Sequence, residues 1–157
     1  MKGHTSTVTH FDWSLDGKII MSNCTSYSIL FFDTTTGKHN PSGASSFKNE
    51  MWSSWSCTLG WPVQGIFPAC ADGTDINACD RSPDATVLAT ADDFGKVKLF
   101  KYPCPVERAQ FVEFRGHSSH VTNCRFVKNT PYIISTGGND KSIFQWKYFL
   151  DKESAQQ

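Results

Sequence analysis

The chain has no excess of charge of either sign, because 15 lysines and arginines are balanced by 15 aspartates and glutamates. Without a net field, the protein as a whole is not drawn to nucleic acid or to an anionic membrane, and we expect neither as a partner. Long apolar runs are also missing. No stretch approaches 18 apolar residues and the first residues lack an apolar core, so we expect no membrane span and no signal peptide.

Paired cysteine motifs are absent as well. The six cysteines stand singly, without a C-x-x-C pair, which argues against a zinc site and against a compact disulfide framework: Cys24, Cys57, Cys70, Cys79, Cys104 and Cys124. We expect them to be small buried residues in a reducing compartment, and we predict no metal and no cofactor.

What the sequence does contain is a repeat, which is clearest in residues 116–146. These read GHSSHVTNCRFVKNTPYIISTGGNDKSIFQW. The stretch opens on Gly-His, turns near residues 128–131 and closes on an apolar strand that ends in Trp146. This layout is typical of one WD-repeat blade of a β-propeller.

A blade of this kind is held together by a buried polar network, which we predict to be a structural tetrad of His117, Thr136, Asp140 and Trp146. His117 would bond both Thr136 and Asp140, and the indole N–H of Trp146 would reach the Thr hydroxyl. A hydroxyl, a His and an Asp are also the groups of hydrolase chemistry. Because nothing nearby resembles a strained turn that exposes a nucleophile, we favour the structural interpretation and predict no catalytic residue.

Two further copies of the pattern begin near His4 and Asp72. Counted from Val8, Ile76 and Val121, each copy has a turn residue eight positions later, an apolar residue twelve later and a closing aromatic 24 or 25 later: Asp16, Asp84 and Asn129; Ile20, Leu88 and Ile133; Phe32, Phe100 and Trp146. The first two copies lack the complete tetrad, and we expect them to depend on apolar packing.

The predicted fold class is therefore all-β: a partial WD-repeat β-propeller of about three four-stranded antiparallel blades within residues 1–148. The repeats cover about residues 3–40, 72–103 and 116–148, residues 106–115 cross to the last repeat, and residues 149–157 form a polar tail. Three unrelated Greek-key hairpins in one sandwich are the alternative.

Residues 41–71 form an insertion between the first two repeats. Apolar and other residues alternate over residues 55–63, which predicts a strand with one buried face that ends near Pro62. Three tryptophans, Trp52, Trp55 and Trp61, lie in or beside this segment and could belong to the core or form an exposed patch for a partner. Farther on, Asp92 and Asp93 could suggest a cation site, but a turn between two strands explains them more simply.

Several strings resemble the C-terminal end of echinoderm microtubule-associated protein-like proteins: GIFP at 65–68, DGTDINA at 72–78, ADDFGKVKLF at 91–100 and GHSSHVTN at 116–123. The resemblance covers roughly residues 3–148, including the Trp-rich insertion. Members of that family carry tandem propellers that together bind tubulin or microtubules, and they act as cytoskeletal scaffolds.

The resemblance implies a non-catalytic segment of a microtubule-associated protein, located in the cytoplasm at the cytoskeleton. Its partners would be tubulin, microtubules or other cytoskeletal proteins, and with no net charge any such contact would need a local patch. A generic WD-repeat adaptor in signalling or ubiquitin-ligase assembly is the alternative. Because propellers typically have four to eight blades, we also expect partners in the remaining blades of a longer chain.

Overall fold

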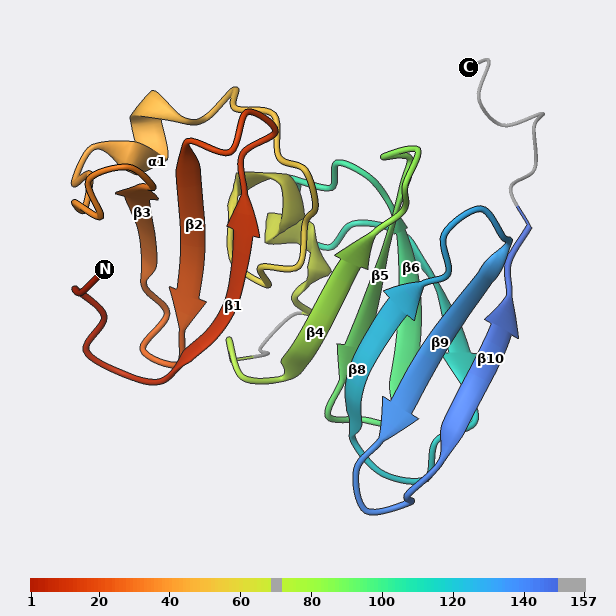
Figure 1. Cartoon of the computed structure of the whole chain (residues 1–157). Coiled ribbons are helices and arrows are strands. Elements are labelled where there is room, and N and C mark those ends of the chain that lie inside the picture. The colour runs from red at the N-terminus through yellow and green to blue at the C-terminus, as the bar shows by residue number, and fades with distance from the viewer. Residues whose placement is uncertain (69–71, 150–157) are drawn as a thin grey trace.

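The chain folds into three antiparallel sheets, seen in a computed structural model that describes residues 1–68 and 72–149 (Figure 1). The first sheet contains β1 (Val8–Trp13), β2 (Ile19–Cys24) and β3 (Ile29–Asp33). The middle sheet contains β4 (Ile76–Arg81), β5 (Val87–Asp92), β6 (Lys96–Lys101) and β7 (Phe111–Arg115). The third sheet contains β8 (Val121–Phe126), β9 (Tyr132–Gly137) and β10 (Ile143–Lys147). This arrangement confirms the predicted fold class of a partial β-propeller.

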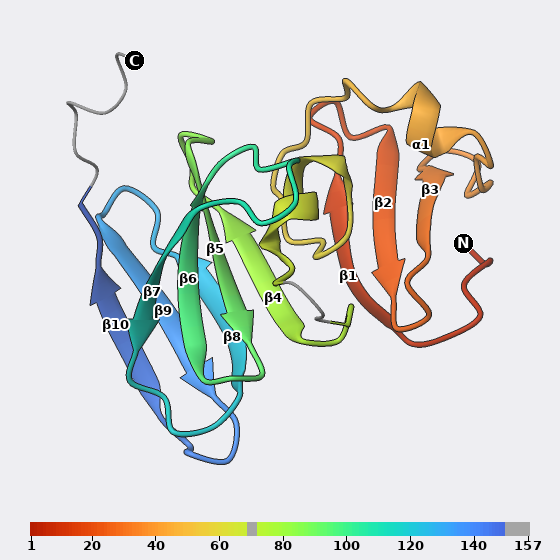
Figure 2. The ribbon, with the colours of Figure 1, turned by 180° about the vertical axis from the view of Figure 1, so that it is seen from behind.

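The sheets differ in strand number. Only the middle one has four strands among the described residues, because β7 pairs with the outer side of β6, from Lys96 opposite Arg115 to Phe100 opposite Phe111. Figure 2 shows β7 beside β6 at the edge of this sheet. The sequence predicts only a connection to the last repeat over residues 106–115. That prediction is wrong for residues 111–115, which form β7. The predicted polar tail begins at residue 149, and most of it lies outside the described residues.

The three sheets share one local irregularity in their first strands. The pairing with the second strand shifts directly after the first residue of the strand, between the following positions: Val8 and His10, Ile76 and Ala78, and Val121 and Asn123. A bulge at the same position changes the direction of the corresponding side chains in the same way in every copy. The repeats found in the sequence are therefore repeats of backbone geometry as well.

The middle and third sheets pack directly against each other. To their shared core the middle sheet contributes three alanines and a valine and the third sheet three further side chains: Ala78, Ala89, Ala91 and Val97; Val121, Cys124 and Ile133. The small residues let the first strands β4 and β8 approach closely, and Figure 1 shows these two strands side by side.

The insertion begins beside β3 of the first sheet and continues into the space between the first and middle sheets. It contains a short helix, α1 (Gly43–Ser46), and a 3-10 helix, η1 (Trp61–Ile66). One hydrophobic cluster unites Met21 and Phe31 of the first sheet with Trp52 and Trp55 of the insertion and Leu88 of the middle sheet. Figure 1 shows the later part of the insertion, in yellow, between β1 and β4, and α1, in orange, beside β3.

The strand expected over residues 55–63 is not formed. The N–H groups of Ser56 and Cys57 donate to the carboxylate of Asp12 instead of to a neighbouring strand. Pro62, which has no N–H to give a ladder, lies at the start of η1. Trp52 and Trp55 belong to the core, whereas Trp61 is 47% exposed. Two of the three tryptophans are therefore core residues, and the third lies at the surface.

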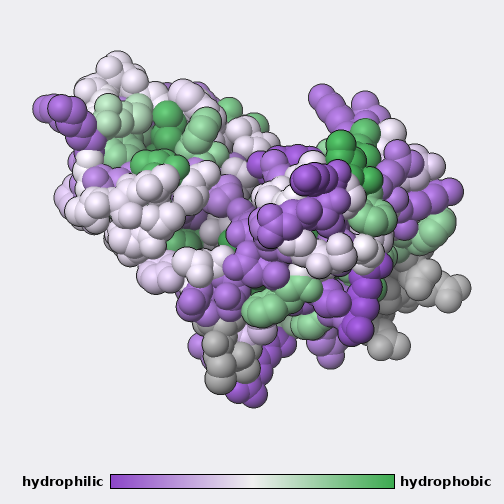
Figure 3. Space-filling view, turned by 90° about the horizontal axis from the view of Figure 1, so that it is seen from below, coloured by the Kyte–Doolittle hydropathy of each residue, from purple (hydrophilic) through white to green (hydrophobic). Residues whose placement is uncertain are grey.

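The face seen from below carries mostly hydrophilic residues over the middle and third sheets, with hydrophobic residues in separate patches (Figure 3). Among the described helices, none has the length and apolar character that crossing a membrane requires.

Candidate functional site

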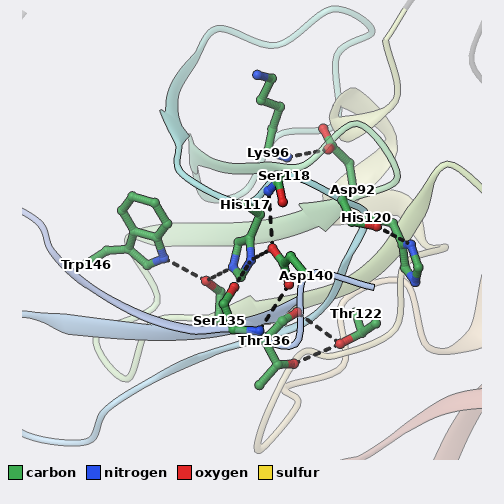
Figure 4. Close-up of polar contacts among 12 residues, drawn as sticks. Asp92, Lys96, His117, Ser118, His120, Thr122, Ser135, Thr136, Asp140 and Trp146 are labelled. Carbon is green, nitrogen blue, oxygen red and sulfur yellow. Dashed lines mark hydrogen bonds and ion pairs between the residues drawn. The ribbon is translucent and has the colours of Figure 1, made fainter. Parts of the chain in front are cut away.

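The predicted network centres on His117, which precedes β8 and whose side chain is fully buried. Its Nδ1 lies 2.8 Å from Oδ2 of Asp140, in the turn between β9 and β10, and its Nε2 lies 2.8 Å from Oγ of Ser135 on β9. Trp146 on β10 donates its indole N–H to the same Ser135 oxygen at 2.7 Å. Figure 4 shows these four side chains converging between the strands.

One assignment of protons satisfies all of these contacts. With a neutral imidazole, His117 donates its Nδ1–H to Asp140 and accepts the Ser135 hydroxyl proton at Nε2. The Ser135 oxygen is then free to accept the Trp146 N–H. Each buried polar group has a partner, so the network stabilises the blade.

The carboxylate of Asp140 is held in place from several directions. It also accepts the backbone N–H groups of Ser118, at 3.2 Å, and Ser142, at 3.1 Å. Burial alone would raise the pKa of Asp140, but the hydrogen bonds from His117 and Ser142 lower it below its ordinary value. Gly137 makes room for this group, because a Cβ there would lie 1.7 Å from Asp140 Oδ1.

The hydroxyl of the network belongs to Ser135, not to Thr136 as predicted. Successive side chains of a strand point to opposite faces, and Ser135 shares its face with the fully buried Ile133. Thr136 points to the other face, where its Oγ1 lies 2.9 Å from that of Thr122 (Figure 4). The sequence held the signal, since Ser135 follows the predicted core residue Ile133 by two positions.

The first sheet keeps half of the network. Nε2 of His4 lies 2.7 Å from Oγ of Ser22, at the positions that His117 and Ser135 occupy in the third sheet. Nδ1 of His4 has no hydrogen-bond partner among the described residues. Phe32 replaces the tryptophan and packs near the His4 ring, with 6.4 Å between the ring centres.

The middle sheet has a buried ion pair that sequence reasoning missed. Asp72, at the histidine position, is exposed and binds Thr74 in its own turn. Nζ of Lys98 lies instead 2.8 Å from Oδ2 of Asp92, with side chains 8% and 0% exposed. The other oxygen of Asp92 accepts the N–H groups of Phe94 and Lys96 at 3.0 and 2.8 Å. Asp92 thus begins the predicted turn and also pairs with the buried ammonium of Lys98, an interaction that the sequence pattern did not indicate.

The described cysteines are free and buried. Burial raises the pKa of Cys57 and Cys79, that of Cys104 to about 11 and that of Cys124 to about 12. Cys70 lies outside the described residues. No group of three or more His, Cys, Asp and Glu side chains within residues 1–68 and 72–149 is arranged to hold a metal ion.

Comparison with known proteins identifies the family of the chain. Residues 1–148 match the family model of the echinoderm microtubule-associated protein second beta-propeller. The human echinoderm microtubule-associated protein-like 4 is 49% identical over 145 residues, which cover 92% of this chain and 15% of that protein. The rat echinoderm microtubule-associated protein-like 2 is 47% identical over 145 residues, 92% of this chain and 22% of that protein.

The chain therefore spans between a seventh and a quarter of the length of these relatives. A likeness in fold alone is found with the crystal structure of the computationally designed Ika4 protein. The TM-score is 0.54 at 15% identity, and the match covers 95% of this chain and 96% of that chain.

Proposed function

The chain belongs to the echinoderm microtubule-associated protein family, and from this premise we propose that it is a non-catalytic WD-repeat segment of a microtubule-associated protein. In this role it contacts tubulin, microtubules or other cytoskeletal proteins in the cytoplasm, and the remaining blades of a longer chain complete its propeller.

The observation that carries the proposal is the extent of the similarity. It spans 92% of the chain at 49% identity, and the family model covers residues 1–148, which include the insertion. A generic WD-repeat adaptor would need to share only the buried pattern that builds blades. The extent and level of this identity favour the cytoskeletal role over adaptor work in signalling or ubiquitin ligation.

The geometry of the network supports a scaffold. The Ser135 hydroxyl is fully buried, donates to His117 and accepts from Trp146. A nucleophile needs a free approach for a substrate and donors placed for the developing charge, and this oxygen is enclosed by its own partners. The His117 and Asp140 side chains are 0% and 7% exposed, so their contacts serve the blade.

Pelleting with taxol-stabilised microtubules tests the proposal. We expect the 157-residue chain to enrich in the pellet and to saturate as microtubules are added. His117→Ala, which breaks the buried network, should reduce the enrichment. The control is His120→Ala, which removes a side chain whose hydrogen bond among the described residues is with Ser119, and this variant should pellet like the wild type. A folded chain that stays in the supernatant under conditions that pellet the full-length human relative would refute tubulin binding by this segment.

A further inference from the structure

A groove lined by aromatic side chains opens between the first and middle sheets. Its volume is about 730 Å³, within the range of about 300–1,000 Å³ typical of ligand sites. It opens at the end that carries the β1–β2 and β4–β5 turns, which is uppermost in Figure 1 and opposite the face in Figure 3. Six aromatic residues line it, and we call it the aromatic groove: Phe31, Phe47, Trp52, Trp55, Trp61 and Tyr102.

The walls of the aromatic groove are braced by contacts between rings. Trp52 meets Trp55 edge to face at 6.2 Å, and Trp55 lies 6.5 Å from Tyr102. Phe31 packs 5.7 Å from Phe47 and 6.1 Å from Trp52. Gly60 allows this packing, because a Cβ at its position would lie 2.6 Å from the Trp55 ring. A site that is already rigid loses little entropy when a ligand binds.

Arg81 supplies a fixed positive charge in the groove. It donates an N–H of Nη2 to the Trp52 carbonyl at 2.7 Å, and its guanidinium lies 5.5 Å from the centre of the Tyr102 ring. No ion pair among the described residues involves Arg81. The guanidinium has five N–H donors in a planar fork, so donors remain for a carboxylate.

The other charges of the groove are Lys48, which lies 5.8 Å from the Trp61 ring, and Glu50. Two cationic side chains against one acidic side chain favour an anionic partner. Trp61, 47% exposed, presents an open aromatic surface at the rim. Grooves of this kind bind extended segments whose proline or apolar side chains pack on the rings.

The aromatic groove does not depend on blades outside this chain, because its walls come from the first sheet, the insertion and the middle sheet. Further blades would pack on the free faces of the first and third sheets instead. The groove is thus a feature of the segment itself.

We propose that the aromatic groove binds a short extended peptide of a partner protein, with one carboxylate paired to Arg81 and flanking proline or apolar side chains packed on Trp61 and Tyr102. The aromatic rings supply buried apolar contact and the arginine fixes the register of the peptide. This site is separate from the proposed contact with tubulin, so either can fail without the other.

Fluorescence polarisation with two pools of labelled hexapeptides tests the inference on the 157-residue chain. One pool has a central Glu flanked by random mixtures of Pro, Leu, Phe and Tyr, and the matched pool has Lys in place of Glu. We expect saturable binding of the Glu pool and binding at least about tenfold weaker for the Lys pool, because a charge-assisted hydrogen bond is lost.

Variants then locate the site. Arg81→Gln should weaken the Glu pool about tenfold or more without affecting the Lys pool. Trp61→Ala should weaken both pools, since it removes an exposed ring. The matched control is Trp13→Ala, another exposed tryptophan, 42% exposed and outside the groove, which should bind like the wild type.

Three results would overturn the inference. The first is no saturable binding of either pool by a chain whose near-UV circular dichroism shows it to be folded. The second is Glu-pool affinity that survives Arg81→Gln. The third is a dimer in analytical ultracentrifugation that Trp61→Ala dissociates, which would place a second copy of the chain in the groove.

Discussion

Cys57 donates its backbone N–H to the carboxylate of Asp12 at 2.8 Å, although 45 positions separate the two residues. Asp80 has the same place in the middle sheet as Asp12 has in the first, and it accepts the N–H of Phe126 in the third sheet at 2.7 Å. The middle sheet is bonded in this way to β8, the first strand of the third sheet. The first sheet is bonded in the same way to the insertion, which therefore takes the place of such a strand. It links two sheets without forming a strand itself.

Replacing Asp12 should therefore loosen the attachment of the insertion. Asp12 is fully buried and accepts hydrogen bonds from Ser54 Oγ and from the N–H groups of Ser56 and Cys57. Asp12→Ala leaves these donors without an acceptor, and we expect a loss of about 3 kcal/mol in the free energy of unfolding, measured in urea. Glu107→Ala, at an exposed position, should leave stability unchanged. An equal midpoint for both variants would contradict this account of the insertion.

The hydroxyl of the network can be identified by a pair of adjacent substitutions. Ser135→Ala removes the partner of both His117 and Trp146 inside the core, and we expect it to cost about 2 kcal/mol. Thr136→Ala affects only an exposed contact with Thr122 and should cost less than about 0.5 kcal/mol. Thermal unfolding followed by circular dichroism compares the two. The reverse order would restore Thr136 to the network.

The repeat itself could be predicted from the sequence because apolar positions recur at fixed spacings in every copy. Ile20, Leu88 and Ile133 all lie twelve positions after their origins. Each pairs with the closing aromatic residue of its own copy, namely Phe32, Phe100 and Trp146. Because alternate residues of a strand share a face, Ser135 lies on the same face as Ile133 and Thr136 lies on the opposite face. The same spacing therefore identifies Ser135 as the buried hydroxyl. Spacing across a strand thus carries more information than residue type.

The insertion could not be predicted by the same rule. Alternation over residues 55–63 reflects burial of Trp55, Cys57 and Val63 in the shared cluster, and a segment without a pairing partner can bury alternate residues just as a strand does. The Lys98–Asp92 pair was hidden for a related reason. Lysine is normally exposed, and only the fold shows that both side chains point into the middle sheet.

Stability should depend on pH through Asp140. The folded state lowers the pKa of this carboxyl below its ordinary value of 3.8, because hydrogen bonds from His117 and Ser142 outweigh the effect of burial. The ionised group therefore contributes stability above its ordinary pKa and loses that contribution as the pH falls through the lower folded-state value. Urea unfolding of wild type and Asp140→Asn should differ at pH 7 and converge toward pH 3. A difference that stays constant over this range would show that Asp140 acts without its charge.

Cys24 should ionise at lower pH than the other described cysteines. Burial raises the pKa of its thiol, but the Ser26 hydroxyl, whose Oγ lies 3.1 Å from the sulfur, and neighbouring backbone N–H groups lower it to about 6. Its thiolate therefore forms at neutral pH, whereas Cys104 stays protonated. Both thiols are buried, at 3% and 5% exposed, so an alkylating reagent does not report on them in the folded chain. We expect the thiolate absorbance in the far ultraviolet, taken as the difference between wild type and Cys24→Ser, to rise with a midpoint near pH 6. Ser26→Ala should move this midpoint to higher pH, and an unchanged midpoint would contradict the role of the hydroxyl.

The buried ion pair of the middle sheet should be costly to break from one side. Lys98→Met keeps most of the apolar length of the side chain but removes the ammonium that faces Asp92, whose carboxylate is fully buried. An uncompensated charge in such a place typically costs about 3–5 kcal/mol. Lys101→Met, on the same strand but exposed, is the matched control and should have almost no effect on the urea midpoint. The double variant Lys98→Met with Asp92→Asn should recover part of the loss, because its asparagine carries no charge yet still accepts the N–H groups of Phe94 and Lys96. If Lys98→Met proves as stable as Lys101→Met, the ion pair does not hold the middle sheet together, and apolar packing alone must do so.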